Sequence, residues 1–151
     1  MEKIQKRVLF KLKTILLLQV QAKKTMVLIG IAGKKRSGKD TAADIIRKNL
    51  KGNCLSFAFA TILKEVVQKV FLISDEEMNN QKEVKIERLG YSPRLLLQKF
   101  GDHFREINSN VFIDYMEHKI SNQTNNVIIT DVRFDNECRF IKKNNGILIG
   151  I

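Results

Sequence analysis

Two glycines and a lysine at a fixed spacing are the residues whose types and pattern point most clearly to chemistry. Gly33, Gly38 and Lys39 match G-x-x-x-x-G-K, the pattern of a loop that wraps the phosphate chain of a nucleotide. Glycines allow the backbone to curl so that successive N–H groups point at phosphate oxygens, and the lysine reaches the β- and γ-phosphates. The predicted triphosphate-binding residues are Gly33, Lys34, Lys35, Arg36, Ser37, Gly38, Lys39, Asp40 and Thr41.

Asp40 departs from the general pattern, which has a Ser or Thr hydroxyl for magnesium at this position. Because Mg²⁺ prefers oxygen ligands, the Asp40 carboxylate is a candidate metal ligand, directly or through water. Thr41, one position later, either supplies the hydroxyl or caps the helix that follows. The sequence leaves both residues as candidates.

A second group of candidate residues follows an apolar segment nearer the end of the chain. Asp131 comes after Val-Ile-Ile-Thr, and Arg133 follows on the same loop. Open α/β sheets bind ligands at the carboxyl ends of their strands. Asp131 is therefore predicted to organise magnesium, and Lys39, Asp131 and Arg133 are the predicted catalytic residues. An exposed Asp-x-Arg turn without a ligand is the alternative.

The elements that must position these residues follow from alternating apolar and amphipathic segments. MVLIGIA (26–32) is a continuous apolar run, as expected of a buried parallel strand. Further strands are predicted at 54–60, 126–132 and 147–151, and helices at 41–50, 60–71, 92–101, 111–120 and 135–144. The polar segment 74–91 is predicted to be irregular. This alternation predicts an α/β fold of the P-loop NTPase type, with a parallel sheet between two layers of helices.

The formal charge of +11 is concentrated in the first part of the chain. Residues 1–25 hold seven basic residues and one acid, whereas the remainder holds 20 basic and 15 acidic residues. The chain is also rich in Lys, Asn and Ile, all with A/T-rich codons, so codon composition is one explanation of the excess. We favour it over a nucleic-acid surface because no aromatic-interleaved basic motif occurs, and no nucleic-acid partner is expected.

Residues 1–25 have apolar side chains at roughly helical spacing with lysines between them. One interpretation is a basic amphipathic helix that contacts a membrane surface or targets the protein. The favoured one is an extension outside the fold, with the natural start at Met26 and one domain over 26–151. The two cysteines, Cys54 and Cys138, form no metal or disulfide pattern, which favours a reducing, cytoplasm-like compartment.

Four motifs in order resemble the deoxynucleoside monophosphate kinases of tailed phages and large DNA viruses, over Met26 to Ile151. The loop ending G-K-D-T is a usual form in that family, which accounts for Asp40. FAFATILKEVVQKVF (57–71) resembles its second motif, and SPRLLLQKFGDHFR (92–105) is similar to its substrate-side helix. TDVRFDNE (130–137) resembles its D-x-R-x-x-x-E motif. The matching residues outside the loop are Ala60, Lys64, Arg94, Gln98, Gly101, Asp131, Arg133 and Glu137.

The resemblance implies transfer of the γ-phosphoryl group of ATP to a deoxynucleoside monophosphate, with Mg²⁺ as cofactor. Its metal-binding candidates here are Asp40, Thr41 and Asp131. The acceptor phosphate calls for bidentate arginine, and the predicted substrate-binding residues are Lys64, Arg94, Gln98, Arg105 and Arg133. Kinases of this kind often form homodimers through helices, so a homodimer is one expectation.

The family continues beyond the point where this sequence stops, into a lid, a last strand and a C-terminal helix. The resemblance therefore implies a C-terminally truncated chain with weakened activity. Two other functions stay open. One is a related P-loop kinase of a small molecule, of the phosphomevalonate or dephospho-coenzyme A type. The other is a truncated nucleotide-binding protein without activity.

Overall fold

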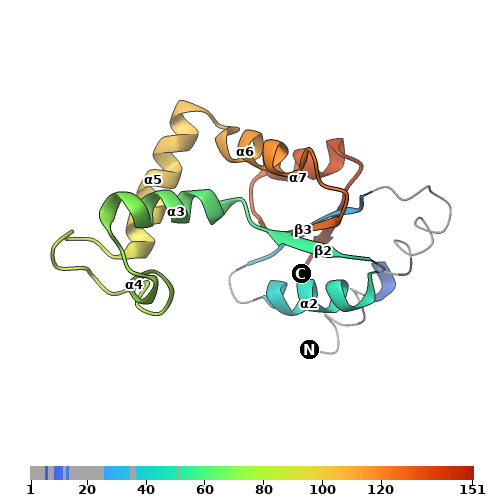
Figure 1. The fold of residues 1–151 in the computed structure, drawn as a ribbon, viewed down its shortest axis with the longest axis horizontal. Coiled ribbons are helices and arrows are strands. Elements are labelled where there is room, and N and C mark those ends of the chain that lie inside the picture. The colour runs from blue at the N-terminus through green and yellow to red at the C-terminus, as the bar shows by residue number, and fades with distance from the viewer. Residues whose placement is uncertain (1–5, 7–8, 12, 14–25, 35–36, 51) are drawn as a thin grey trace. The chain divides into compact units, whose positions relative to one another are not determined.

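The computed structural model describes residues 6, 9–11, 13, 26–34, 37–50 and 52–151, which form two compact units (Figure 1). The sheet unit comprises Met1–Ala58 and Met116–Ile151, and the helical unit comprises Phe59–Tyr115. Residues 6, 9–11 and 13 are helical. The rest of the amphipathic segment predicted at 1–25 lies outside the described residues. Among the described residues, no helix combines the length and apolar character needed to cross a bilayer.

The sheet unit is built on four parallel strands in the order β2-β3-β1-β4. Their bounds are β1 (Leu28–Ala32), β2 (Cys54–Phe57), β3 (Asn126–Val132) and β4 (Ile147–Gly150). All four strands were predicted. β2 is shorter than expected because the chain turns at Phe59 and begins a helix at Ala60. The order puts β1, which leads into the glycine loop, beside β3, which carries Asp131.

Helices cover both faces of this sheet (Figure 1). Ile29 and Ile31 of β1 share a buried cluster with Ala42 and Ile46 of α2 (Lys39–Asn49). The residue between them, Gly30, points to the opposite face, because side chains alternate along a strand. A Cβ atom at Gly30 would lie 2.8 Å from Ile141 Cγ1 of α7 (Asp135–Lys143). The predicted three-layer α/β fold is therefore confirmed.

The helical unit contains α3 (Ala60–Phe71), α4 (Asp75–Asn79), α5 (Pro93–Ile107) and the first half of α6 (Val111–Ile120). α3 and α6 match their predicted bounds, and Ser92 caps α5 by accepting a hydrogen bond from the Leu95 N–H at 3.3 Å. The prediction that α5 ends near Gly101 is wrong. Gly101 lies inside the helix and faces α3. A Cβ atom added to it would lie 3.0 Å from Leu63 Cδ2.

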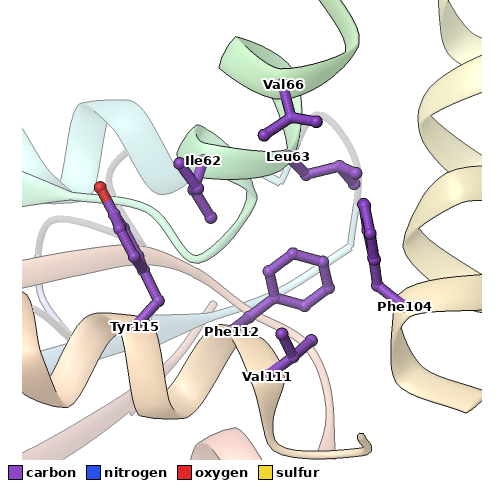
Figure 2. Close-up of a pocket in the computed structure, with 7 residues that line it drawn as sticks. All are labelled: Ile62, Leu63, Val66, Phe104, Val111, Phe112 and Tyr115. Atoms are coloured by element: carbon purple, nitrogen blue, oxygen red, sulfur yellow. The ribbon is translucent and has the colours of Figure 1, made fainter. Parts of the chain in front are cut away.

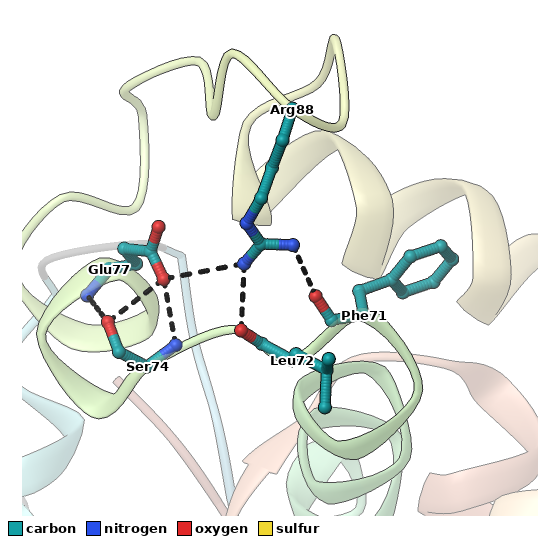
Figure 3. Close-up of polar contacts among 5 residues, drawn as sticks. All are labelled: Phe71, Leu72, Ser74, Glu77 and Arg88. Atoms are coloured by element: carbon teal, nitrogen blue, oxygen red, sulfur yellow. Dashed lines mark hydrogen bonds and ion pairs between the residues drawn. The ribbon is translucent and has the colours of Figure 1, made fainter.

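The segment 74–91 contains a short helix that the sequence interpretation missed. Ser74 and Glu77 form a capping box at the start of α4: the Glu77 N–H donates to Ser74 Oγ at 3.2 Å, and the Ser74 N–H donates to Glu77 Oε2 at 2.8 Å (Figure 3). Arg88 donates to the carbonyls of Phe71 and Leu72, each at 2.7 Å. Arg88 thereby links this segment to the C-terminal end of α3 through hydrogen bonds. The last carbonyls of a helix have no partner within it and accept such positively charged donors.

Hydrogen bonds from the Ser74 backbone and hydroxyl lower the pKa of Glu77, and the nearby Arg88 acts in the same direction. Because the folded-state pKa lies below the unfolded one, the charged carboxylate stabilises the fold above the unfolded pKa. That stabilisation is lost as the pH falls through the folded pKa. Glu77→Gln is expected to lower the urea midpoint at pH 7, and its difference from the wild type should shrink as the pH falls through the folded-state pKa of Glu77. Glu65→Gln, on the exposed side of α3, controls for a general loss of negative charge. An equal effect of both variants would contradict the prediction.

Candidate functional site

The glycine loop connects the end of β1 to the start of α2. Gly33 and Lys34 follow the strand, and Ser37 and Gly38 precede the helix; the predicted phosphate ligands Lys35 and Arg36 lie outside the described residues. Gly38 has φ 89° and ψ 23°, a left-handed conformation that glycine adopts without steric cost. The next residues form the first turn of α2, whose N–H groups have no partner within the helix and favour an anion.

Lys39 lies at the centre of this loop. Its Nζ donates to the carbonyl of Gly33 at 2.9 Å and to that of Lys34 at 2.6 Å. The Lys39 ammonium at the start of α2 therefore lies against the first residues after β1, and the described parts of the segment have the predicted strand–loop–helix order. This geometry holds one positive charge beside the N-terminus of α2, where the helix dipole adds partial positive charge.

Gly33 and Ser37, from the two described ends of the loop, lie close together. A Cβ atom at Gly33 would lie 2.6 Å from Ser37 Oγ and 3.2 Å from the carbonyl oxygen of Ile151. Ser37 Oγ is buried and has no hydrogen-bond partner among the described residues. A side chain at position 33 would force the Ser37 hydroxyl to move and would lie close to the Ile151 carbonyl, so the close approach favours glycine here.

A bulge in β3 positions Asp131. Gly30 pairs with Ile129 and Ala32 with Val132, so Thr130 and Asp131 together oppose the single residue Ile31. A bulge of this kind redirects side chains and is common next to active sites. Asp131 is half-buried and adjoins the point where β1 passes into the loop. Asp131 therefore lies near the carboxyl end of β3, beside the end of β1 from which the loop begins; its metal-binding role stays a prediction.

Glu137 holds the turn that carries Arg133. Its Oε2 accepts hydrogen bonds from the backbone N–H groups of Arg133 at 2.7 Å and Phe134 at 3.1 Å. The Glu137 side chain is buried, with 3% exposure, whereas Arg133 is exposed. The motif match had included Glu137 without assigning it a role. Its spacing of three residues after Phe134, at the start of a helix, is the signal that identifies it as a capping residue.

The remaining predicted substrate residues lie in the helical unit. The Lys64 ammonium of α3 donates a hydrogen bond to the Asn79 side-chain oxygen. Gln98 is exposed on α5. Arg94 pairs with Glu83, with Nε and Oε1 2.5 Å apart. Arg105 lies over the Phe112 ring, 4.7 Å from its centroid. Arg94, Gln98 and Arg105 are spaced by four and seven residues, which puts them on one face of the helix.

The oxygen ligands in the sheet unit suit magnesium. Asp131 is half-buried beside the loop, and Asp40 and Thr41 are exposed in the first turn of α2. The described residues hold no group of three or more His, Cys, Asp or Glu side chains able to bind a metal. Mg²⁺ in kinases is usually held by one or two carboxylates, and substrate phosphates and water supply the rest. The donor set therefore fits that ion.

Comparison with known proteins identifies the family. The family model described as phosphomevalonate kinase matches residues 31–146, which include the loop, Asp131 and Arg133. The chain belongs to this family of P-loop kinases. A protein of Acanthamoeba polyphaga mimivirus described as "Putative deoxynucleotide monophosphate kinase" is 38% identical, and the alignment covers 83% of this chain and 74% of the viral protein. The resemblance indicated by the motifs is thus confirmed, and the family model and the viral relative carry different acceptor names.

Proposed function

We propose that this kinase transfers the γ-phosphoryl group of ATP to a deoxynucleoside monophosphate and releases ADP and the deoxynucleoside diphosphate. ATP as the phosphoryl donor is inferred mainly from the Lys39 ammonium, which bonds the carbonyls of Gly33 and Lys34 between β1 and the N-terminus of α2. Asp131 lies near the end of the neighbouring strand β3. The acceptor is inferred from the motifs and from the name of the viral relative.

The chemistry requires little of the protein beyond positioning and positive charge. A phosphate oxygen of the acceptor forms the new bond to the γ-phosphorus, while the bond to the oxygen that bridges to the β-phosphate breaks. At neutral pH the acceptor phosphate is mostly a dianion, so no general base is needed. Lys39 stabilises the negative charge of the β- and γ-phosphates, and Arg133 that of the transferring group. Asp131, with Asp40 or Thr41, would hold Mg²⁺, which neutralises charge on the β- and γ-phosphate oxygens.

In this proposal, residues of the helical unit bind the phosphate of the acceptor. Arg94 and Arg105 offer planar guanidinium groups that bind phosphate through two parallel hydrogen bonds. Lys64 and Gln98 are the further proposed contacts. Lys64 and Arg94 each have a partner from the segment 74–91, namely Asn79 and Glu83. A phosphate that binds Arg94 must therefore share the guanidinium group with the Glu83 carboxylate or displace it.

Glu83→Gln is expected to lower KM for the deoxynucleoside monophosphate. The Glu83 carboxylate repels the incoming dianion. Because the Glu83 side chain is largely exposed and that of Arg94 partly exposed, the effect is limited to about threefold to tenfold. The KM for ATP should stay unchanged. Steady-state kinetics with the acceptor varied at saturating ATP measure it, and Glu87→Gln in the same segment is the matched control. A rise in KM would show instead that Glu83 positions Arg94 productively.

Phosphomevalonate is the second candidate acceptor, because the matching family model carries its name. The test is a coupled assay of ADP release with ATP and each acceptor in turn: the four deoxynucleoside monophosphates, phosphomevalonate and dephospho-coenzyme A. We expect turnover with the deoxynucleotides. Turnover confined to a non-nucleotide acceptor would refute the proposed acceptor and keep the kinase assignment.

A further inference from the structure

The two units bury different kinds of side chain. The cavity of about 220 Å³ in the helical unit is lined by apolar groups, apart from the Tyr115 hydroxyl (Figure 2). A polar ligand inside it would find few hydrogen-bond partners. The sheet unit, in contrast, buries a charge. Glu137 of α7 is 3% exposed, and no other charged side chain in the described part of the chain is buried.

Glu137 accepts both backbone hydrogen-bond donors of a short connection. Only Arg133 and Phe134 separate the end of β3, at Val132, from the start of α7, at Asp135. The Oε2 atom of Glu137 accepts the N–H of Arg133 at 2.7 Å and that of Phe134 at 3.1 Å. These N–H groups belong to the peptide planes before and after the Arg133 Cα atom. One oxygen therefore sets the orientation of the Cα atom from which the guanidinium side chain extends.

Side-chain packing fixes this connection only at its two ends. Val132 of β3 is buried at one end, and α7 buries Ile141 at the other. Arg133 is exposed and Phe134 is 42% exposed, so neither side chain is buried deeply enough to anchor its own backbone. Between the two ends, the hydrogen bonds to Glu137 hold the backbone.

Keeping this carboxylate inside the protein is costly, which argues for a specific role. A buried charge loses its hydration and needs hydrogen-bond donors in return. Two backbone N–H groups supply them, and the N-terminal turn of α7 adds a favourable helix dipole. A residue that only capped a helix could stay partly in water, as Glu77 does at the start of α4. Burial shields the two hydrogen bonds of Glu137 from water and so strengthens them.

We propose that Glu137 is a positioning residue for Arg133, whose guanidinium group reaches the transferring phosphoryl group from the backbone that the buried carboxylate holds. The inference rests on the proposed function, in which Arg133 stabilises that phosphoryl group. Because it is buried, Glu137 touches no substrate and acts only through the orientation of Arg133. A displacement of a catalytic group by about 1 Å costs up to about 100-fold in rate.

Three substitutions separate the geometry of Glu137 from its charge. Glu137→Gln keeps an oxygen at the same reach, with two lone pairs for the two N–H groups, so kcat should fall by less than about tenfold. Glu137→Asp keeps the charge but draws the carboxylate back by one carbon, about 1.5 Å, and Glu137→Ala removes the acceptor. Both should lower kcat by about tenfold to 100-fold.

The KM for ATP should stay unchanged in all three variants, because the loop of Lys39 binds ATP in the proposed function. The kcat values are measured with whichever acceptor the wild type phosphorylates, so a wrong acceptor does not affect the comparison. A wild-type kcat in Glu137→Asp, together with a large loss in Glu137→Gln, would assign the effect to charge and overturn the inference.

A double-mutant cycle shows whether Glu137 acts through Arg133. If it does, Glu137→Ala should lower kcat by less than about twofold in protein that already carries Arg133→Ala, because the group that it positions is gone. A merely structural role would lower kcat by the same factor in both backgrounds. Asp135→Ala removes the exposed acid at the first position of α7. It is the matched control and should leave kcat unchanged.

Backbone hydrogen exchange gives a readout that needs no turnover. The amides of Arg133 and Phe134 should be protected in the wild type and in Glu137→Gln. They should exchange about tenfold faster or more in Glu137→Ala, which lacks their acceptor. The amide of Ile129 in β3 reports whether the sheet is intact. If Glu137→Ala fails to fold, Glu137→Met, which fills the space without an acceptor oxygen, replaces it with the same expectations.

Two results would overturn the inference alone: equal losses from Glu137→Ala in both backgrounds of the cycle, or unchanged exchange of the Arg133 and Phe134 amides in folded Glu137→Ala protein. Unchanged kcat in Arg133→Ala would overturn the inference together with the role of Arg133, and would leave the kinase assignment standing. If the wild type phosphorylates no acceptor of the panel, the inference and the proposed function both fail.

Discussion

Lys39→Ala is expected to lower kcat/KM for ATP by about 1,000-fold, the upper range for loss of one preorganised charge in an active site. In the structure the Lys39 ammonium is held by the carbonyls of Gly33 and Lys34, at the N-terminus of α2. This fixed position means that the charge is already in place when the phosphates arrive. Lys39 is half-buried on a helix whose core residues are elsewhere, so the fold should persist.

The loss should appear in ATP binding measured by calorimetry and in the coupled assay of ADP release. Circular dichroism and the melting temperature check that the variant is folded. Lys48→Ala, an exposed basic residue in the last turn of the same helix, controls for the removal of one positive charge from α2. Wild-type ATP affinity in folded Lys39→Ala protein would refute the assignment of the loop as the ATP site.

The parts of the fold that could be predicted are those that depend on local pattern. The loop could be predicted from the spacing of Gly33, Gly38 and Lys39 alone. The buried strands could be predicted from their continuous apolar runs, one directly before the loop and the others later in the chain. Gly101 shows where local pattern fails. A glycine near the end of an apolar periodicity usually stops a helix, but here Gly101 lies inside α5, where a Cβ atom would lie only 3.0 Å from Leu63 of α3. This tertiary contact, which the sequence does not display, gives the glycine a packing role in place of a stop.

The sequence indicated the residue types of the candidate site, whose roles stay predictions, and said less about its geometry. The position of Asp131 after an apolar segment placed it near the carboxyl end of a strand, which is where it lies in β3. The bulge that sets Thr130 and Asp131 against Ile31 depends on the pairing register of β1 and β3, which a single strand does not encode. The capping box of Ser74 and Glu77 was readable as S-x-x-E, but the polar composition of 74–91 concealed it. The partners of Lys64 and Arg94 come from that same segment, so they could not be anticipated.

Asp131→Asn is expected to lower kcat by about 100-fold and to weaken the apparent affinity for Mg²⁺ by about tenfold or more. The change keeps the size of the side chain and removes its negative charge, so the bulge at Thr130 and Asp131 should survive. The lost charge is the one that would attract a divalent cation to the edge of the sheet beside the loop. Assays with Mg²⁺ varied at fixed ATP measure both effects, and thermal melting verifies the fold.

Asp40→Asn is the informative comparison, because it makes the same change on the other side of the loop. Asp40 is exposed in the first turn of α2, whereas Asp131 is half-buried at the end of β3. A carboxylate less exposed to water interacts more strongly with a nearby cation, so Asp131→Asn should be the more damaging by about tenfold. Added salt should reduce the effect of Asp40→Asn more than that of Asp131→Asn, because screening acts mainly on exposed charges. The reverse ranking would place the metal on the α2 side of the loop and assign Asp131 to maintaining the turn before Arg133.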